Sequence, residues 1–555
     1  MTIRFLPLGE AALTVELGKR ISPAINARVH ALHASLNAAP LPGVIESVPA
    51  YRSLTLYYDP LALSLDELQS QVKERFASLP SEADVAGQSH IIPVAYGGEF
   101  GPDLESVAEE TSLSPEQVIA EHSRVVYRVY MVGFSPGFPY LGRTSAKLQV
   151  GRLATPRTRV PAGSVAIAGR QTGLYPSSTP GGWRLLGRTG WRFFDPMRLP
   201  PARLQPGDQV RFRPTSPDEI NDSPEWGKPA TPAPVDGRPV IEVLGGGLLT
   251  TVQDSGRYCF QSFGVPVAGT VDTAAMRAAN LLVGNSTESA VLEITLAGPV
   301  LRFWNDALVA VTGADLALWV EWPDGKRWNL PGWLTIYVRR GSTLGLAGRK
   351  SGCRAYLAIA GGLAVPQVLG SASTCLAGSF GGHAGRKLER GDRLMVSESS
   401  LDVALRAGRS WPVSLQPRYS NRPEVRVLPG SQWGQFTRQA QAGFLAGEYT
   451  VQPASDRVGL RVKGPALQRK RATEIISSGV TAGSIQVPND GQPIVLMADR
   501  QTAGGYAQIA VAISADLPLL AQLVPGDRVT FRRVTMGEAV AALHAQRAAE
   551  TRWLR

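Results

Sequence analysis

The chain has 555 residues, of which 44% are hydrophobic and 19% are charged, and its formal net charge is +11. A chain of this length and composition can bury the cores of about three or four globular domains, which excludes a disordered polymer. Its 58 glycines and 42 prolines are spread along the sequence, so we expect many short strands joined by tight turns rather than a helical bundle.

The positive charge comes mainly from dispersed arginines. A nucleic-acid-binding protein would gather basic residues beside stacking aromatic rings, so we expect small anionic ligands and no nucleic acid. The N-terminus lacks a signal-peptide pattern and no apolar run approaches about 18 residues, so we predict a cytoplasmic protein that does not span a membrane. Cysteine usage favours a reducing compartment, because three widely spaced cysteines without a CxxC pattern cannot all pair: Cys259, Cys353 and Cys375.

Residues 1–88 are predicted to form a small α+β domain. The segments at 11–17 and 53–58 have the residue pattern of strands. The first is followed by a helix start at Ser22-Pro23, and the second by a capping box formed by Ser64 and Glu67. Two histidines fall on the first helix, His30 and His33. We expect them to cap or solvate its polar side.

Residues 89–214 are predicted to form a β domain. A strand at 125–130 runs into a loop at 131–142, where glycines and prolines stand among aromatic residues and favour a rigid, irregular turn. The strand phrase at 204–212 ends the domain. Residues 215–239 are rich in proline, acidic and small residues and lack periodicity, which is typical of a linker.

The second half begins with another predicted β domain at 240–400, in which Asp272 caps a helix that Gly284 ends. A polar bridge at 401–423 leads to a further β domain at 424–535. An Ala-rich helix at 536–555 closes the chain, and we expect it to dock on a neighbouring domain.

Three phrases of the first half return in the same order near the end of the chain. Ala162-Gly163-Ser164 is echoed at 482–484, Arg170-Gln171-Thr172 at 500–502, and the strand phrase at 204–212 is echoed at 523–531. The repetition predicts that one β-rich unit is used at least twice. The second copy carries extra residues between its first two phrases, including 487–493, which we expect to form a hairpin or loop. A weaker echo of the closing phrase stands at 388–394.

Common catalytic motifs are missing from the sequence. Gly345–Ser351 has the wrong glycine spacing for a phosphate-binding loop, no histidine pair has HxH or HExxH spacing, and no GxSxG elbow is present. What remains is a set of polar residues on glycine-rich turns. Amides, hydroxyls and backbone N–H groups suit the binding of an amide, lactam or carboxylate, although each residue could instead stabilise its own turn.

Long segments of the chain resemble a known pair of families. YGGEFGPDL, GFSPGFPYLG and VPAGSVAIAGRQTGLYPSSTPGGW are similar to the B subunit of prokaryotic 5-oxoprolinase, also known as allophanate hydrolase first subunit or Kip-type kinase inhibitor. VQDSGR, LEITLAGP, GSIQVPNDGQPIVLMADRQTAGGY and LVPGDRVTF resemble the C subunit of the same enzyme, which is a biotin-dependent carboxyltransferase-like family. The chain therefore resembles a fusion of the B and C subunits. It departs from the family pattern at Ala268–Asp272, where the family tends to read SGAMD.

The resemblance implies an α+β, mostly β fold, with a small ferredoxin-like N-terminal domain followed by repeated cyclophilin-like β-barrel domains. It also implies ATP-dependent opening of 5-oxoproline to L-glutamate together with the separate A subunit of 5-oxoprolinase. ATP with Mg²⁺ would be used at a site that this sequence does not locate. Biotin is not expected, because the chain carries no Met-Lys-Met carrier motif.

A lactam is a poor electrophile, so we expect its carbonyl oxygen to be phosphorylated before water attacks. Such chemistry needs arginines and backbone N–H groups around phosphate and carboxylate, and a group that manages protons. The residues that we predict for catalysis are Asp254, Gln171 and Gln501. Those predicted for substrate binding are Arg159, Tyr175, Arg257, Tyr506, Thr172 and Thr502, and no metal ligand is predicted.

Two other functions stay open from the sequence. One is a carboxyltransferase or allophanate hydrolase-type enzyme of urea metabolism, which would need biotin. The other is a non-catalytic inhibitor of a sensor kinase. A neighbouring gene for the A subunit of 5-oxoprolinase, for biotin carboxylase or for a sensor kinase would favour one of the three.

Overall fold

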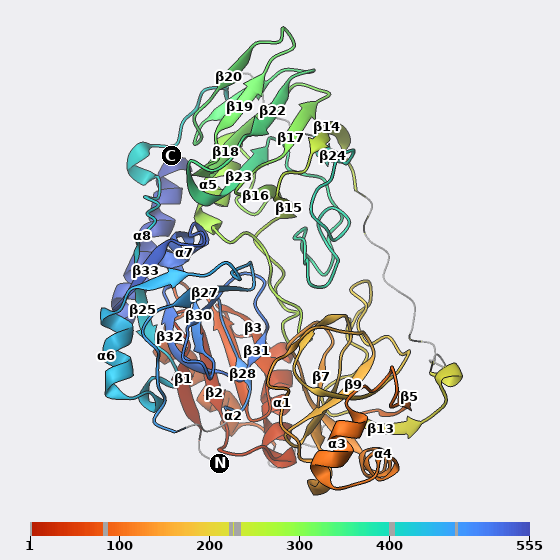
Figure 1. The fold of residues 1–555 in the computed structure, drawn as a ribbon. Helices are drawn as coiled ribbons and strands as arrows, with labels where there is room; N and C mark the ends of the chain where they lie inside the picture. Colours follow the sequence, from red (N-terminus) through yellow and green to blue (C-terminus); the bar gives the residue numbers. More distant parts are fainter. Residues whose placement is uncertain are drawn as a thin grey trace.

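The computed structural model describes residues 3–80, 87–220, 226, 233, 235–398, 406–471 and 475–554. They form an N-terminal unit of sheet and helices, two closed seven-stranded barrels, and a unit of two sheets. Figure 1 shows the two barrels and the N-terminal unit in its lower part and the two-sheet unit above them. The predicted α+β, mostly β class is confirmed. Within these residues, no helix is both long enough and apolar enough to cross a membrane.

The N-terminal unit is an antiparallel sheet with two helices on one face. Alternate residues of its strands, such as Leu13 and Leu54, pack against the helices, and the opposite face packs against the second barrel through Tyr57 and Val511. The helix starts at Pro23 and Ser64 are as the sequence predicts. The elements are β1 (Arg4–Pro7), β2 (Ala12–Glu16), α1 (Pro23–Ala38), β3 (Val44–Pro49), β4 (Ser53–Tyr58) and α2 (Leu65–Ala77), with sheet order β1-β2-β4-β3.

The prediction that His30 and His33 cap or solvate the polar side of α1 is wrong for His30, whereas His33 is half-buried. His30 is buried with its Nε2 atom 2.8 Å from the Tyr130 carbonyl oxygen, and His33 Nδ1 lies 2.7 Å from Ser47 Oγ. Burial lowers the pKa of both histidines to about 4. The sequence misleads here because α1 is covered on a second side, where Asn26 also donates to the Tyr130 carbonyl of the first barrel at 3.1 Å.

The first barrel is closed by a parallel pair, in which the last strand β13 lies beside the first strand β5. A two-stranded sheet and two helices flank it. Its strands are β5 (Ser89–Tyr96), β6 (Tyr127–Val132), β7 (Pro139–Arg143), β9 (Ser164–Ala168), β10 (Gln171–Leu174), β12 (Arg184–Arg188) and β13 (Gln209–Pro214). The flanking elements are α3 (Leu104–Thr111), α4 (Pro115–Ser123), β8 (Arg157–Val160) and β11 (Thr179–Gly181).

The second barrel repeats this topology strand for strand. Read around the barrel, β25-β32-β29-β30-β27-β26-β33 corresponds to β5-β12-β9-β10-β7-β6-β13, and β25 and β33 are again parallel. The predicted duplication is therefore confirmed. Its elements are β25 (Glu424–Pro429), α6 (Arg438–Ala446), β26 (Tyr449–Val451), β27 (Gly459–Lys463), β28 (Ser478–Gly479), β29 (Ser484–Val487), β30 (Ile494–Leu496), β31 (Ala503–Gly504), β32 (Ala507–Ala512), α7 (Leu517–Ala521) and β33 (Arg528–Arg533).

The two Arg-Gln-Thr phrases do not occupy equivalent positions. In the first barrel Gln171 opens β10, whereas Gln501 follows β30 and precedes β31. The extra residues of the second copy form the turn of the β29–β30 hairpin, as predicted, and this hairpin is the counterpart of β9–β10. The sequence misleads because the repeated phrase lies one strand later in the second copy.

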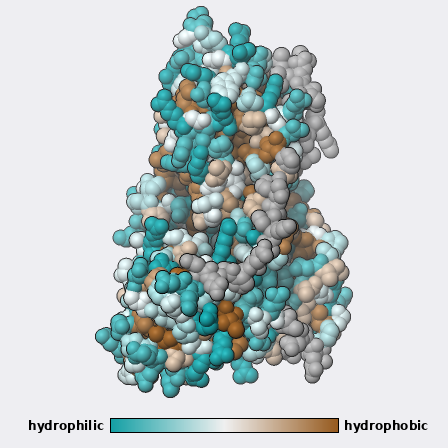
Figure 2. All heavy atoms as spheres, turned by 90° about the vertical axis from the view of Figure 1, so that its right-hand side faces the viewer, coloured by the Kyte–Doolittle hydropathy of each residue, from teal (hydrophilic) through white to brown (hydrophobic). Residues whose placement is uncertain are grey.

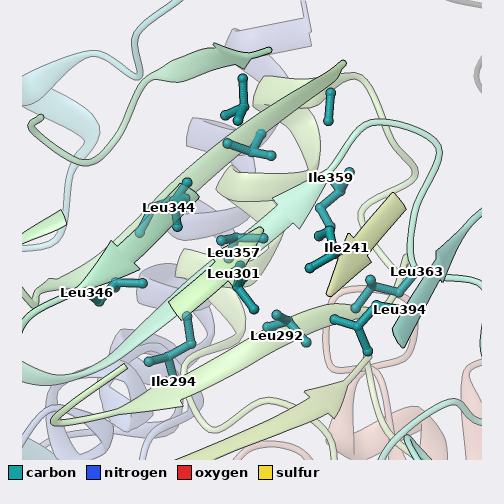
Figure 3. Close-up of a cluster of buried hydrophobic side chains, with 14 of the residues drawn as sticks. Ile241, Leu292, Ile294, Leu301, Leu344, Leu346, Leu357, Ile359, Leu363 and Leu394 are labelled. Atoms are coloured by element: carbon teal, nitrogen blue, oxygen red, sulfur yellow. The ribbon is translucent and has the colours of Figure 1, made fainter. Parts of the chain in front are cut away.

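The middle unit stacks a six-stranded sheet on a five-stranded one. Figure 3 shows leucines and isoleucines of both sheets meeting between them, among them Leu301 and Leu344 from one and Leu292 and Leu357 from the other. The weaker echo at 388–394 leads into an edge strand, β24, rather than a barrel strand. The elements are β14 (Arg238–Gly245), β15 (Leu249–Gln253), α5 (Thr273–Val283), β16 (Val291–Thr295), β17 (Val300–Phe303), β18 (Ala307–Asp315), β19 (Leu318–Glu321), β20 (Arg327–Asn329), β21 (Thr335–Val338), β22 (Thr343–Leu346), β23 (Ser351–Ile359) and β24 (Arg393–Val396).

The C-terminal helix α8 (Met536–Leu554) docks on neighbouring elements, as predicted. Arg277 of α5 forms an ion pair with Glu550 at 3.1 Å, which ties α8 to the two-sheet unit. Figure 1 shows α8 running along one side from the second barrel towards that unit. Figure 2 shows one face of the molecule, on which hydrophobic residues gather in small patches among hydrophilic ones.

The two halves of the chain interlock through the irregular loop that follows β6. The Gly137 N–H donates to the Phe263 carbonyl at 2.8 Å, and Val132 forms a parallel bridge with Phe263. Gly264 lies so close to this loop that a Cβ atom there would be 2.3 Å from the Ser135 carbonyl oxygen. The loop is therefore a docking surface for the second half of the chain.

Candidate functional site

A cavity of about 680 Å³ lies between the two barrels, beside the N-terminal unit. The first barrel contributes the β9–β10 turn around Arg170, and the second contributes the β29–β30 turn through Asn489. Because these hairpins are counterparts in the two barrels, the cavity forms where equivalent parts of the duplicated unit face each other. Tyr51 of the N-terminal unit and the segment Ile475–Ser477 complete its wall.

The cavity is strongly cationic. Four arginines line it, and no Asp or Glu does so within the part of the chain that the structure describes. Three of them form no ion pair with a described carboxylate, and the Nε atom of Arg170 is buried without a hydrogen-bond partner. Guanidinium groups without carboxylate partners favour oxyanions that accept two parallel hydrogen bonds, such as carboxylate and phosphate. The three are Arg143, Arg152 and Arg170, and the fourth is Arg469.

The neutral part of the wall combines amides with aromatic rings. The Gln171 side-chain N–H donates to the Tyr51 hydroxyl, and the Tyr51 ring packs against Tyr130 and Tyr140 at centroid distances of 5.4 and 5.9 Å. Tyr140 packs behind Tyr51 and is not a lining residue, and burial raises the pKa of its hydroxyl. Such a wall can orient a small planar amide beside the arginines through hydrogen bonds and ring contacts.

Two of the residues predicted from the sequence line this cavity, Gln171 and Tyr506. Gln501 lies beside it rather than in it, with its Nε2 atom 2.8 Å from where a Cβ on Gly504 would stand. Thr502 is buried, and its side chain packs near Gly133 of the interlocking loop.

The other first-half predictions lie within the barrel itself or on its surface. Thr172 is buried, with its hydroxyl 2.9 Å from His122 Nε2, and it donates to the Ala166 carbonyl at 3.0 Å. Tyr175 is buried against Phe138. The Arg159 side chain is exposed and donates to Ser178 Oγ at 3.0 Å. A role for these three residues at the cavity stays a prediction.

Asp254 and Arg257 lie in a tightly bonded turn of the two-sheet unit. The Asp254 carboxylate accepts hydrogen bonds from the Ser371 hydroxyl at 2.7 Å and the Ala372 N–H at 2.6 Å. Arg257 is fully buried and donates to the carbonyls of Val368 at 2.7 Å and Ser373 at 2.8 Å. These contacts engage both side chains in holding the turn, and a catalytic or binding role for them stays a prediction.

The arginines of the cavity are not among the residues that the sequence predicts. Arg170 directly precedes Gln171 in a repeated phrase, so its place in the turn is a signal that could have found it. Arg143 ends β7, Arg152 lies in the segment after it and Arg469 in the segment after β27, and neither periodicity nor a motif marks them. Within the described ranges no cluster of three or more His, Cys, Asp or Glu residues could hold a metal ion.

Comparison with known proteins divides the chain into two matched parts. Residues 3–204 match the family described as carboxyltransferase domain, subdomain C and D, and residues 263–533 match carboxyltransferase domain, subdomain A and B. The chain is 45% identical to the B subunit of 5-oxoprolinase from Bacillus subtilis over 224 residues, which is 38% of this chain and 93% of the relative. It is 38% identical to the C subunit of 5-oxoprolinase from Escherichia coli over 314 residues, covering 55% of this chain and 95% of the relative.

A solved structure resembles nearly the whole chain. The crystal structure of TTHA0988 in space group P212121 is 37% identical in sequence and superposes with a TM-score of 0.81. The match covers 96% of this chain and 100% of that one. The arrangement of both halves is therefore shared with a solved protein.

Proposed function

The chain belongs to the carboxyltransferase-domain family, as a fusion of two halves that are like the B and C subunits of 5-oxoprolinase, and we propose that it is a component of an ATP-dependent 5-oxoprolinase. Together with the separate A subunit of that enzyme, it opens the lactam ring of 5-oxoproline to give L-glutamate. The observation that carries this proposal is the arginine-lined cavity between the two barrels, which has the size and charge for a small acidic lactam.

The chemistry of ring opening explains why such a cavity would be cationic. ATP supplies a phosphoryl group to the lactam carbonyl oxygen, which makes the ring carbon electrophilic. Water then adds to that carbon, the ring C–N bond breaks, and hydrolysis with a second water releases inorganic phosphate and glutamate. The reacting molecule carries both a carboxylate and a phosphate, so it needs several guanidinium partners.

The residues of this chain have distinct roles in that scheme. Arg143, Arg152, Arg170 and Arg469 bind the carboxylate and phosphate oxygens, and the Gln171 side-chain N–H donates to the lactam carbonyl oxygen. Tyr51 keeps the Gln171 amide oriented through its hydroxyl. ATP and Mg²⁺ are used by the complex that the chain forms with its partner, and the arginines fit the phosphate that results.

We also propose which known fold types the N-terminal unit and the two barrels belong to. The segment β2-α1-β3-β4-α2 has the element order of a ferredoxin-like fold without its last strand, and β1 takes the edge position beside β2. The two closed barrels are assigned to the cyclophilin-like type. The shared strand order of both barrels supports a common origin of the unit.

The proposal is tested by mixing the purified chain with an A subunit of 5-oxoprolinase, ATP and 5-oxoproline and measuring glutamate and phosphate. Arg170→Gln and Arg152→Gln should each reduce glutamate formation about 10- to 100-fold, because a charge-assisted hydrogen bond contributes roughly 1.5–3 kcal/mol. Arg302→Gln, which changes an exposed arginine of β17, is the matched control and should keep full activity. Wild-type turnover that neither cavity substitution changes would remove the cavity from the mechanism.

A further inference from the structure

A second cavity, of about 180 Å³, lies between the N-terminal sheet and the second barrel. The same short segment borders both cavities: Ile475 and Ile476 line both, Ser477 lines the first and Ser478 lines the second. The two cavities are therefore neighbours separated by a single chain segment. Ser477 and Ser478 are adjacent but line different cavities, and Ser478 is the first residue of β28.

The second cavity differs from the first in its charges. Glu16 lines it with its carboxylate 2.8 Å from Arg52 Nη2, and only a tenth of the Glu16 side chain is exposed. Lys19 also lines it and forms no ion pair with any described residue. One carboxylate and two cations thus border the second cavity. In the first cavity, all the charged residues among the described lining are cations.

Uncharged hydrogen-bonding groups fill the rest of its wall. Thr14 and Ser53 come from the face of the N-terminal sheet that is turned away from the helices, and Ser431, Gln432 and Gln435 come from the second barrel. The side-chain carbonyl oxygen of Gln432 accepts from the Gln508 N–H at 2.9 Å, so its amide N–H₂ is the end left to donate. Such a wall suits a small, highly polar molecule.

Ring opening changes the charge of the molecule in a way that matches this difference. The lactam nitrogen is an uncharged amide, whereas the opened product has an ammonium group and a second carboxylate. The first cavity has no carboxylate among its described lining residues to receive an ammonium group, and the second has Glu16. Lys19 and Arg52 are the corresponding partners for carboxylates.

We propose that the second cavity is a binding site for the ring-opened product, an α-amino dicarboxylic acid with a net charge of about −1 at neutral pH. The inference rests on the proposed function, since it takes the opened lactam as its ligand. Glu16 receives the ammonium group and Lys19 a carboxylate. The product leaves the arginine-lined cavity past Ile475–Ser478, so each cavity holds the species whose charges it matches.

The test measures binding to the full chain by isothermal titration calorimetry, with L-glutamate and 5-oxoproline as separate probes. Lys19→Gln should weaken glutamate binding about 10-fold and leave 5-oxoproline binding unchanged, whereas Arg170→Gln should do the reverse. Lys73→Gln, which changes an exposed lysine on α2, is the matched control and should alter neither. A second variant, Ser478→Val, adds bulk at the wall of the second cavity without removing a charge and should also weaken glutamate binding.

The outcomes separate this inference from the proposed function. Glutamate binding that is absent, or unchanged in both Lys19→Gln and Ser478→Val, overturns the product site even if the complex turns over 5-oxoproline. Glutamate binding that depends on Lys19, in a chain that forms no glutamate with its partner, supports the site and overturns only the proposed enzyme activity.

Discussion

At the scale of single residues, hydrogen-bond partners distinguish a side chain that faces the cavity from one that holds a turn. Gln171 and Asp254 are alike in the sequence, since both are polar residues in glycine-rich phrases. Asp254 binds two backbone N–H groups, of Gly256 and Ala372, whereas Gln171 faces the cavity beside the unpaired Nε of Arg170. The cavity residues can therefore be tested by changing charge without changing shape.

Gln171→Glu places a carboxylate in a cavity whose described lining has none. The new charge would pair with Arg170 and repel the anionic substrate, so we expect the KM for 5-oxoproline to rise about 10-fold or more while the melting temperature changes little. Steady-state kinetics of the reconstituted complex and thermal unfolding of the chain measure both quantities. An unchanged KM would show that the substrate does not approach Gln171.

The buried histidines make the stability of the chain depend on pH. Burial lowers the folded-state pKa of His30 and His33 to about 4, and that of His122 to about 3, from an ordinary value of 6.5. Below pH 6.5 the unfolded chain binds more protons at these histidines than the folded chain does. Their contribution to the free energy of unfolding is therefore fully present above about pH 6.5 and is lost as the pH drops towards 4. At about 1.4 kcal/mol per pKa unit, the full loss is roughly 3 kcal/mol each for His30 and His33 and roughly 5 kcal/mol for His122.

Urea unfolding of the wild type at pH 7 and pH 5 measures the effect. His33→Asn removes one titrating group on α1 and should reduce the difference between the two pH values. If the wild type is equally stable at both values, these histidines do not control its acid sensitivity.

At the scale of elements, the sequence predicts strands, caps and the repeat well but misplaces one correspondence. The capping box at Ser64 is predictable because its contacts are local, and the closing strands β13 and β33 are predictable because their phrases repeat. The equivalence of β10 and β30 was not readable, because it depends on pairing around a closed barrel rather than on neighbouring residues. The sequence predicts that the loop after β6 is rigid and irregular. It does not predict that Gly264 packs against this loop, because that contact joins distant parts of the chain.

Gly264→Ala tests that interlock between the halves. The added methyl group would meet the Ser135 carbonyl oxygen at 2.3 Å, and Gly264 also has a φ of +76° that disfavours alanine. Gly98→Ala is the matched control, since Gly98 has a φ of +53° but nothing within 4 Å of the added atom. We expect the control to lose about 1 kcal/mol of unfolding free energy and Gly264→Ala to lose clearly more. Equal losses would mean that the loop yields freely.

At the scale of the whole molecule, buried charges hold the second barrel against the two-sheet unit. Arg457 of the barrel region donates to the carboxylates of Asp499 and of Glu293 on β16, and to the Gly269 carbonyl. All three charged side chains are buried. Residues so far apart in the sequence gave no sign of this cluster, because a buried ion pair has no local pattern. The cavity between the barrels is equally non-local, which is why the sequence predicts only two of its lining residues, Gln171 in a repeated phrase and Tyr506 just after one.

Arg457→Met tests whether this cluster fixes the arrangement of the two units. It leaves the Asp499 carboxylate without its cation, whereas Glu293 keeps Arg354 at 3.9 Å. Breaking a buried ion pair in this way costs about 3–5 kcal/mol, so we expect a large drop in the free energy of unfolding. The double variant Arg457→Met, Asp499→Asn removes the uncompensated charge and should recover much of the loss. Denaturant unfolding at neutral pH compares the three proteins. If the single and double variants are equally unstable, the contribution of Arg457 is its packing and its bond to Gly269 rather than its pairing with Asp499.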